Sequence, residues 1–462
     1  MISEWEIVAS NLNLKDWSQL YYAISCISKV PFVNVGAYKE SSQLFGKNCN
    51  DISRYMILLS DYLCDDMFFY IVSQGHLAQL QKSITSAHIT TAAINNALVS
   101  SIVLNQLVDG FFNDFDPNIA LFLFDHLQKQ NSLRLSKAEY NGLLKLVVES
   151  GTEAIINQVI QKPGFNLAAN NNHTIISVCK YGYVHILERL LAKPEVDPGA
   201  NRNMAIINAC RFGHYRIAEM LLLDPRVDPT DDENCALRLA CEHGHLQIVD
   251  LLLNDGRCEP SCRNNYPIRI ASMNGHLDII KRLIADDRVN PSANSSSAIG
   301  YAAENGHLEI VKYLLQVPKI DPSADSDYAI RHAAERGRFD IVQLLIKDRR
   351  VDPSNRNNYA IRSASQNGHF EIVKLLLQDS RVNAADDKNY AIRTACRYGR
   401  VEVVELLLSV PNVDPTDVND YCIKSAVQFG HEKIVSLLLQ DGRARMPTTP
   451  PLGGLFDYLF VI

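Results

Sequence analysis

The chain has 462 residues, a formal net charge of -7 and an isoelectric point near 6.0. A nucleic-acid-binding surface neutralises phosphates with Lys and Arg and is generally basic, so this composition argues against a nucleic-acid partner. No apolar run reaches the roughly 18 residues that a membrane helix needs, and the first residues lack the basic and apolar regions of a secretion signal. We therefore expect no membrane insertion, and a cytoplasmic protein with the nucleus as the alternative.

Residues 1–50 are predicted to form an N-terminal helical segment. Within residues 5–32, the stretches L-N-L-K-D-W-S-Q-L and I-S-K resemble an F-box, the helical module that docks a substrate receptor onto a ubiquitin-ligase scaffold. The Leu-Pro opener of that module is missing, and one residue is inserted between Glu6 and Leu14. An ordinary amphipathic helix pair is the alternative reading of the same residues.

Residues 51–140 contain apolar runs such as Y-M-I-L-L-S-D-Y-L without the Gly and Pro residues that separate short strands. This pattern predicts helices. The region is either a helical cap that shields the end of the segment beginning at residue 141, or a set of degenerate repeats. Gly75-His76-Leu77 would be the remnant of one such repeat.

A repeat of 31 residues runs through the rest of the chain without an insertion. Its clearest mark is a glycine, usually followed by His and an I-V-x-L-L-L run. Fixed-period self-similarity of this length is typical of solenoid proteins, in which each unit buries its apolar face against its neighbours. The glycines are Gly182, Gly213, Gly244, Gly275, Gly306, Gly337, Gly368, Gly399 and Gly430.

Each unit is predicted to contain two short helices and an extended finger. The first helix ends at the glycine, where a left-handed backbone is accessible. The second carries an apolar stripe, as in Ile372, Val373, Leu376 and Leu377, and prolines such as Pro353 stop it from continuing. The predicted N-cap residues of the first helices are Asn172, Asn203, Asn234, Asn265, Ser296, Asp327, Asn358, Asn389 and Asp420.

These units resemble ankyrin repeats. Y-A-I-R-S-A-S, G-H-F-E-I-V-K-L-L-L and R-V-D-P-S stand where that family has T-P-L-H-x-A-A, G-H-x-x-V-V-x-L-L-L and G-A-D-V-N. The units are shorter than the family's repeat of about 33 residues, and the Thr-Pro opener is absent. The resemblance implies an all-α, ankyrin-type helical-repeat solenoid over residues 141–446, with about ten repeats if residues 141–171 form one.

Cysteines and histidines recur at equivalent positions of the repeat. Cys179, Cys210, Cys241 and Cys396 share one position, which predicts small core residues. Cys258 and Cys262 form no C-x-x-C pair, so we expect no zinc site and no cofactor. Reduced thiols are typical of the cytosol and nucleus. The His residues after the glycines would lie about 10 Å apart in a stack, too far to share a metal ion, and a turn-stabilising role is predicted for them.

Two rows of opposite charge also follow the period. Arg238, Arg269, Arg331, Arg362, Arg393 and Lys424 lie on the first helices, and Asp197, Asp228, Asp321, Asp352 and Asp414 lie in the fingers. Because the ankyrin resemblance places each finger beside the next first helix, the two rows are predicted to form ion pairs. Replacing Arg331 and Arg362 with Gln is therefore predicted to lower the melting temperature. A basic stripe for an acidic partner is the alternative.

The resemblance implies a non-catalytic scaffold or adaptor that binds a protein partner on a concave face made by the ends of the first helices and the fingers. Catalytic motifs such as G-x-S-x-G and H-E-x-x-H are absent, so we expect no enzyme, and a monomer. A ubiquitin-ligase substrate receptor is the alternative function. The candidate partner-binding residues are Lys180, Tyr181, Arg211, Phe212, Glu335, Arg336, Arg397, Tyr398 and Phe429.

The chain ends in residues 447–462, a Pro-rich linker followed by an apolar tail. Leu455 to Ile462 is too short to span a bilayer. The tail is predicted to cover the last repeat, or alternatively to present its C-terminus to an extended-peptide binder.

Overall fold

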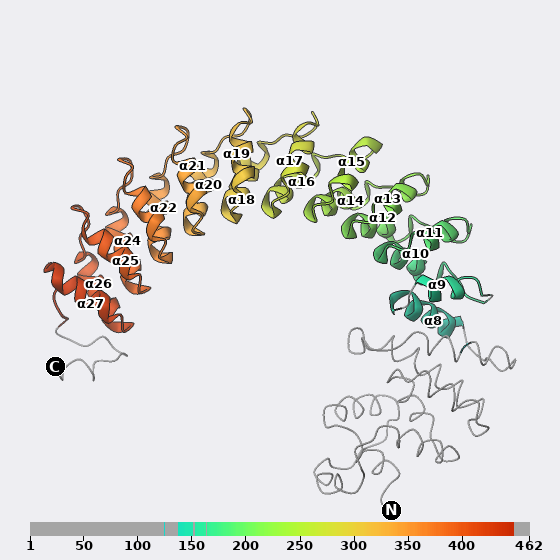
Figure 1. The fold of residues 1–462 in the computed structure, drawn as a ribbon, viewed down its shortest axis with the longest axis horizontal. Coiled ribbons are helices and arrows are strands. Elements are labelled where there is room, and N and C mark those ends of the chain that lie inside the picture. The colour runs from blue at the N-terminus through green and yellow to red at the C-terminus, as the bar shows by residue number, and fades with distance from the viewer. Residues whose placement is uncertain (1–123, 125–136, 151–152, 163, 448–462) are drawn as a thin grey trace, which may run out of the picture. The chain divides into compact units, whose positions relative to one another are not determined.

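A computed structural model describes residue 124 and residues 137–150, 153–162 and 164–447 (Figure 1). All regular elements in these residues are helices, which confirms the predicted all-α repeat fold. The F-box-like segment, most of residues 51–140 and the apolar tail lie outside the described residues. The chain divides into two compact units, residues 1–205 and 206–462, and each is described by itself.

The described part of unit 1 contains two helix pairs. Helix α10 packs on α8 and α11 packs on α9. The apolar side chains Leu143, Ile156 and Ile175 are fully buried in these pairs. The helices are α8 (Lys137–Ser150), α9 (Glu153–Val159), α10 (Ala169–Tyr181) and α11 (Val184–Leu191), and α12 (Ala200–Phe212) contains the division between the units.

Unit 2 continues the same pattern, and its pairs follow one another in a row in Figure 1. First helices pack on first helices and second helices on second helices. The elements after α12 are α13 (Tyr215–Leu222), α14 (Asp231–Glu242), α15 (Leu246–Asp255), α16 (Cys262–Asn274), α17 (Leu277–Ile284), α18 (Ala293–Asn305), α19 (Leu308–Leu315), α20 (Ala324–Glu335), α21 (Phe339–Leu345), α22 (Asn355–Asn367), α23 (Phe370–Leu376), α24 (Asp386–Arg397), α25 (Val401–Leu408), α26 (Asp417–Gln428) and α27 (Glu432–Asp441).

The apolar stripe of each second helix forms the core together with small residues of the first helices. In α23, Ile372, Val373 and Leu376 are buried, as the spacing predicts. Each such side chain contributes roughly 1.5–3 kcal/mol when it is fully buried. In α22, Ala360 and Ala364 are buried as well. Alanine at these positions lets neighbouring first helices approach closely.

The predicted N-caps are wrong, because each first helix from α10 to α26 begins with three residues in the left-handed conformation. In α22 these are Arg356, Asn357 and Asn358, with φ of 52°, 54° and 55°. We call these three residues of a repeat its left-handed turn. Outside glycine, such a residue costs about 1–2 kcal/mol. The turn occurs in nine repeats, and its third member is the predicted cap residue in each.

The third residue of the left-handed turn binds the next finger instead of capping its own helix. The Oδ1 atom of Asn358 accepts the backbone N–H of Asn383 at 2.8 Å. The N-cap residue of α22 is Ser354, which makes no side-chain cap bond. The same bond recurs in other repeats, where the finger amides of Asp197, Glu259, Asn290, Asp321, Asp352 and Asp414 donate to Asn172, Asn234, Asn265, Ser296, Asp327 and Asn389.

The predicted pairing of the Arg row with the finger Asp row is also wrong. The Asp228 carboxylate accepts the N–H and hydroxyl of Thr230 within its own finger, at 2.9 and 2.7 Å. The Arg331 guanidinium donates to the carbonyls of Ser326 and Asp325, the first two residues of its left-handed turn, at 2.7 and 2.9 Å. The row therefore stabilises an unfavourable backbone turn, because each guanidinium offers a fork of donors to adjacent carbonyls.

The recurrent histidines stabilise turns, as predicted. The Nε2 atom of His276 lies 3.0 Å from the carbonyl oxygen of Glu242 in the preceding repeat. Where arginine replaces histidine, as at Arg338, its Nε donates to the matching carbonyl, that of Glu304, at 3.2 Å. These bonds link the helix ends of successive repeats.

Candidate protein-binding surface

The ends of the first helices position the candidate residues. Each first helix ends just before its glycine, and Gly399 and Gly430 have φ of 72°. The apolar side of the helix faces the core, so the two residues before the glycine face outward. Tyr398 and Phe429 are each 47% exposed. Exposed aromatic side chains of this size are a feature of protein interfaces.

Arg397, Tyr398 and Phe429 form one cluster on α24 and α26. The guanidinium carbon of Arg397 lies 5.9 Å from the centre of the Tyr398 ring and 5.6 Å from that of Phe429. Its Nη1 donates to the hydroxyl of Tyr421 at 3.0 Å. The cation–π contacts hold the three exposed side chains together, and the hydrogen bond to Tyr421 fixes Arg397 in place. This order lowers the entropy lost when a partner binds. We call Arg397, Tyr398 and Phe429 the C-terminal cluster.

Two smaller cation–π pairs lie at the ends of earlier first helices. In unit 1, the Lys180 amine is 5.0 Å from the centre of the Tyr181 ring. In unit 2, the guanidinium carbon of Arg211 is 5.7 Å from the centre of the Phe212 ring, and Phe212 is exposed. Each pair presents an aromatic face beside a cation.

Glu335 and Arg336 are held by neighbours within the repeats. The Glu335 carboxylate accepts the Tyr359 hydroxyl at 3.1 Å and lies 2.9 Å from Nδ1 of His332. Nη2 of Arg336 donates to Glu304 at 3.0 Å. Burial acts to raise the pKa of Glu304, but hydrogen bonds from Tyr328 and Arg336 outweigh it and leave that pKa lowered. These residues therefore have existing partners that a ligand would have to displace or share.

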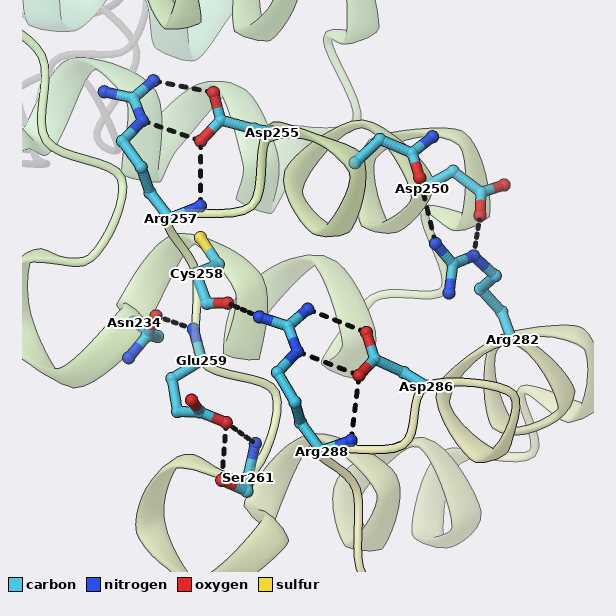
Figure 2. A network of polar contacts seen from close by, with 11 residues as sticks. Asn234, Asp250, Asp255, Arg257, Cys258, Glu259, Ser261, Arg282, Asp286 and Arg288 are labelled. Atoms are coloured by element: carbon cyan, nitrogen blue, oxygen red, sulfur yellow. Dashed lines mark hydrogen bonds and ion pairs between the residues drawn. The ribbon is translucent and has the colours of Figure 1, made fainter.

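The fingers carry a set of contacts that sequence reasoning missed. Arg257 and Arg288 each bind the carboxylate two residues earlier through two nitrogens, Asp255 at 2.7 and 2.8 Å and Asp286 at 2.9 and 2.8 Å (Figure 2). The remaining nitrogen of Arg288 donates to the carbonyl of Cys258 in the preceding finger at 2.9 Å (Figure 2). Arg257 and Arg288 thus tie their fingers to the fingers before them.

This Asp-x-Arg unit was present in the sequence as a second 31-residue series. The remaining pairs are Asp224 with Arg226, Asp348 with Arg350, Asp379 with Arg381 and Asp441 with Arg443. The hydrogen bond from Arg257 lowers the pKa of Asp255, and the equivalent arginines do the same for the other acids. The fingers are thereby ordered before any partner arrives.

The repeated cysteines are buried core residues, as predicted. Cys179, Cys210, Cys241 and Cys396 have no exposed surface. Burial raises the pKa of each thiol. Such thiols stay protonated and are poor nucleophiles. Among the described residues, no group of three or more His, Cys, Asp or Glu side chains is placed to hold a metal ion.

Within the described part of the chain, no helix is long and apolar enough to cross a membrane. A family model of three ankyrin repeats matches residues 175–264, 237–326, 299–386 and 361–447. The solved ankyrin repeat domain of human ASB11 is 21% identical and is covered over 95% of its length by 40% of this chain, with a TM-score of 0.35. No curated protein matches the chain.

Proposed function

The chain belongs to the ankyrin-repeat family, and on this premise we propose that it is an adaptor or scaffold that holds a protein partner against the ends of its first helices. Ankyrin repeats are generally non-catalytic modules of protein–protein interaction. The proposed contact residues are Lys180, Tyr181, Arg211, Phe212, Glu335, Arg336, Arg397, Tyr398 and Phe429.

The C-terminal cluster is the observation that carries this proposal. Tyr398 and Phe429 are large, exposed and held by Arg397 within 6 Å of both ring centres. Tyr and Arg dominate the energetics of many protein interfaces, and truncating one such residue can cost about 2 kcal/mol or more. We therefore place the strongest anchor of the partner at α24 and α26.

The test compares two triple variants in affinity capture followed by binding measurement on the purified partner. Arg397→Ala, Tyr398→Ala and Phe429→Ala together should weaken binding at least about 30-fold, since about 2 kcal/mol corresponds to that change. The control variant carries Leu223→Ala, Leu439→Ala and Tyr215→Ala, which remove exposed apolar side chains of the second helices. Equal loss in both variants would show that the first-helix ends are not the binding face.

We further propose that the protein works as a monomer in the cytoplasm or nucleus without a nucleic-acid partner. The net charge of -7 supports the absence of a nucleic-acid partner. The described cysteines are all free, and free thiols are typical of those compartments. Sedimentation analysis at several concentrations and localisation of a tagged chain test these statements separately.

A substrate receptor of a ubiquitin ligase is the second candidate, supported by the F-box-like residues 5–32. In this case the repeats would select the substrate and residues 1–50 would contact the ligase scaffold. Deleting residues 1–50 should then remove ligase subunits from the captured proteins while other partners remain. Capture without ligase subunits in both forms would leave the plain adaptor.

A further inference from the structure

Tyrosine and arginine side chains alternate along the first helices of unit 2. The guanidinium carbon of Arg331 lies 5.9 Å from the centre of the Tyr328 ring in its own repeat and 5.3 Å from that of Tyr359 in the next. Arg362 continues the series at 4.3 Å from the centre of the Tyr390 ring. Each guanidinium is thus flanked by aromatic rings. We call this series the Tyr–Arg row.

Each arginine of this row also binds one or two carbonyls of the left-handed turn in its own repeat. Arg393 donates to Lys388 and Asp387 at 2.8 and 3.1 Å, in the same way as Arg331. Arg238 makes the equivalent two bonds. The repeated position therefore has a defined chemistry: two adjacent carbonyl acceptors at one end and aromatic rings at the side.

The row is interrupted at one repeat. Ser297 stands at the tyrosine position and Gly300 at the arginine position of α18. The two residues leave a cavity of about 140 Å³, which is also lined by Asn294, Tyr328 and Asp325. A cavity of about this size holds a benzene molecule, and a guanidinium has fewer heavy atoms. We call this cavity the slot.

The slot lining contains a buried polar atom that has no hydrogen-bond partner. This atom is the Oγ of Ser297, which can accept a hydrogen bond from a ligand. Gly300 has no side chain that could reach the carbonyls of Asn294 and Ser295. A buried hydroxyl without a partner destabilises the folded protein, and a ligand that hydrogen-bonds to it would remove that destabilisation.

We infer that the slot binds the guanidinium of an arginine side chain presented by a partner protein. The group would occupy the place that Arg331 occupies in the next repeat, donating to the carbonyls of Asn294 and Ser295 beside the ring of Tyr328. Its charge suits the lining, in which Asp321 and Asp325 are the ionisable carboxylates and no Lys or Arg takes part. Asp325 also lies 3.4 Å from Nη2 of Arg356 in a half-exposed ion pair, which a bound guanidinium would share.

The chain cannot fill the slot with a residue of its own at position 300 without rearrangement. A Cβ atom on Gly300 would lie 2.8 Å from Cδ1 of Tyr328. Earlier repeats have Ile176 and Ile207 at this position, so among the described repeats the glycine is particular to α18. The slot lies at the beginning of a first helix, and the proposed partner-binding residues lie at first-helix ends, so the two proposals can fail separately.

The test uses ligand-detected NMR on the full chain with N-acetyl-arginine methylamide as the probe. Saturation transfer should be at least about threefold stronger for this probe than for the citrulline analogue, which has a similar shape without the charge, and for the lysine analogue, which lacks the planar fork. Gly300→Arg supplies a guanidinium from the chain itself, as Arg331 does in the next repeat, and should abolish the arginine signal. Asp325→Asn should weaken it.

Asp340→Asn is the control, because it removes one negative charge from the exposed surface of α21 away from the slot. It should leave the arginine signal unchanged. Circular dichroism checks that each variant is folded, and Asp325→Asn decides the question if Gly300→Arg does not fold. Equal signals for arginine and citrulline, or an arginine signal that survives both slot variants, would overturn the inference.

Discussion

His276 packs directly against Gly244 of the preceding repeat. A Cβ atom at Gly244 would lie 2.6 Å from Cε1 of the His276 ring, and the glycine has φ of 82°. The same ring places Nε2 3.0 Å from the carbonyl of Glu242. The recurrent Gly-His pair is therefore an interaction between successive repeats: the glycine of one makes room for the histidine of the next.

Gly244→Ala should destabilise the protein by about 2–4 kcal/mol, because it adds steric overlap with His276 to the strain of a left-handed alanine. Gly256→Ala is the matched control. Gly256 also has φ of 82°, but a Cβ there meets no atom within 4 Å. It should cost only about 1–2 kcal/mol. Urea unfolding measures both, and equal losses would mean that contact with the histidine is unimportant.

Arg288→Lys should lower the free energy of unfolding by about 1–2 kcal/mol. Lysine keeps the charge but cannot bind both oxygens of Asp286 and the Cys258 carbonyl together. Arg263→Lys serves as the comparison, because Arg263 and Glu233 form an ion pair that is largely exposed. That change should leave the free energy of unfolding nearly unchanged. If chemical denaturation gives the same small loss for both, the finger contacts do not contribute to stability.

Stability should decrease when the pH falls below about 4. Hydrogen bonds from Arg257 and its equivalents hold the pKa of Asp255 and the other five finger acids below the usual value of about 3.9. A lowered folded-state pKa gives stability that is present above the unfolded pKa and lost as pH falls through the folded pKa. Asp327 contributes in the opposite direction: burial raises its folded-state pKa, so its protonation at low pH favours the folded protein.

Melting curves between pH 7 and pH 3 measure this dependence. Asp255→Asn should make the decline at acidic pH shallower, because one of the six titrating groups is gone, while lowering the melting temperature at pH 7. A melting temperature that rises between pH 4 and pH 3 would contradict the assignment of the finger acids as stabilising carboxylates.

Arg331→Gln should lower the free energy of unfolding by about 1–3 kcal/mol, since it leaves the carbonyls of Asp325 and Ser326 without their charged donors. The sequence also predicted a loss of stability for this change. The cause, however, is the loss of donors to the left-handed turn and not the loss of an ion pair with a finger carboxylate. Asp321→Asn tests this distinction. It should be nearly neutral if Arg331 is independent of the finger, and as costly as Arg331→Gln if the two were paired.

The sequence by itself determined the repeat and its fold. The invariant spacing from Gly182 to Gly430, the buried stripe of each second helix and the stacking role of the histidines all follow from periodicity, because residues at equivalent positions of a solenoid have equivalent neighbours. For the same reason, the burial of Cys210 and Cys241 was readable from the one position that they share. The outward position of Tyr398 and Phe429 was predicted correctly too.

The tertiary structure decided which neighbour each polar side chain binds. Asparagine is a favoured N-cap residue, but Asn358 is the last of three left-handed residues. The turn directs its side chain to the finger, where it accepts the backbone N–H of Asn383. Arg331 likewise binds the carbonyls of its own left-handed turn. The small residues Ser297 and Gly300 line a cavity because neighbouring repeats carry larger side chains at these positions. Periodicity gives the position of a residue in a repeat, but hydrogen-bond partners depend on backbone direction within a few ångströms, which spacing alone does not specify.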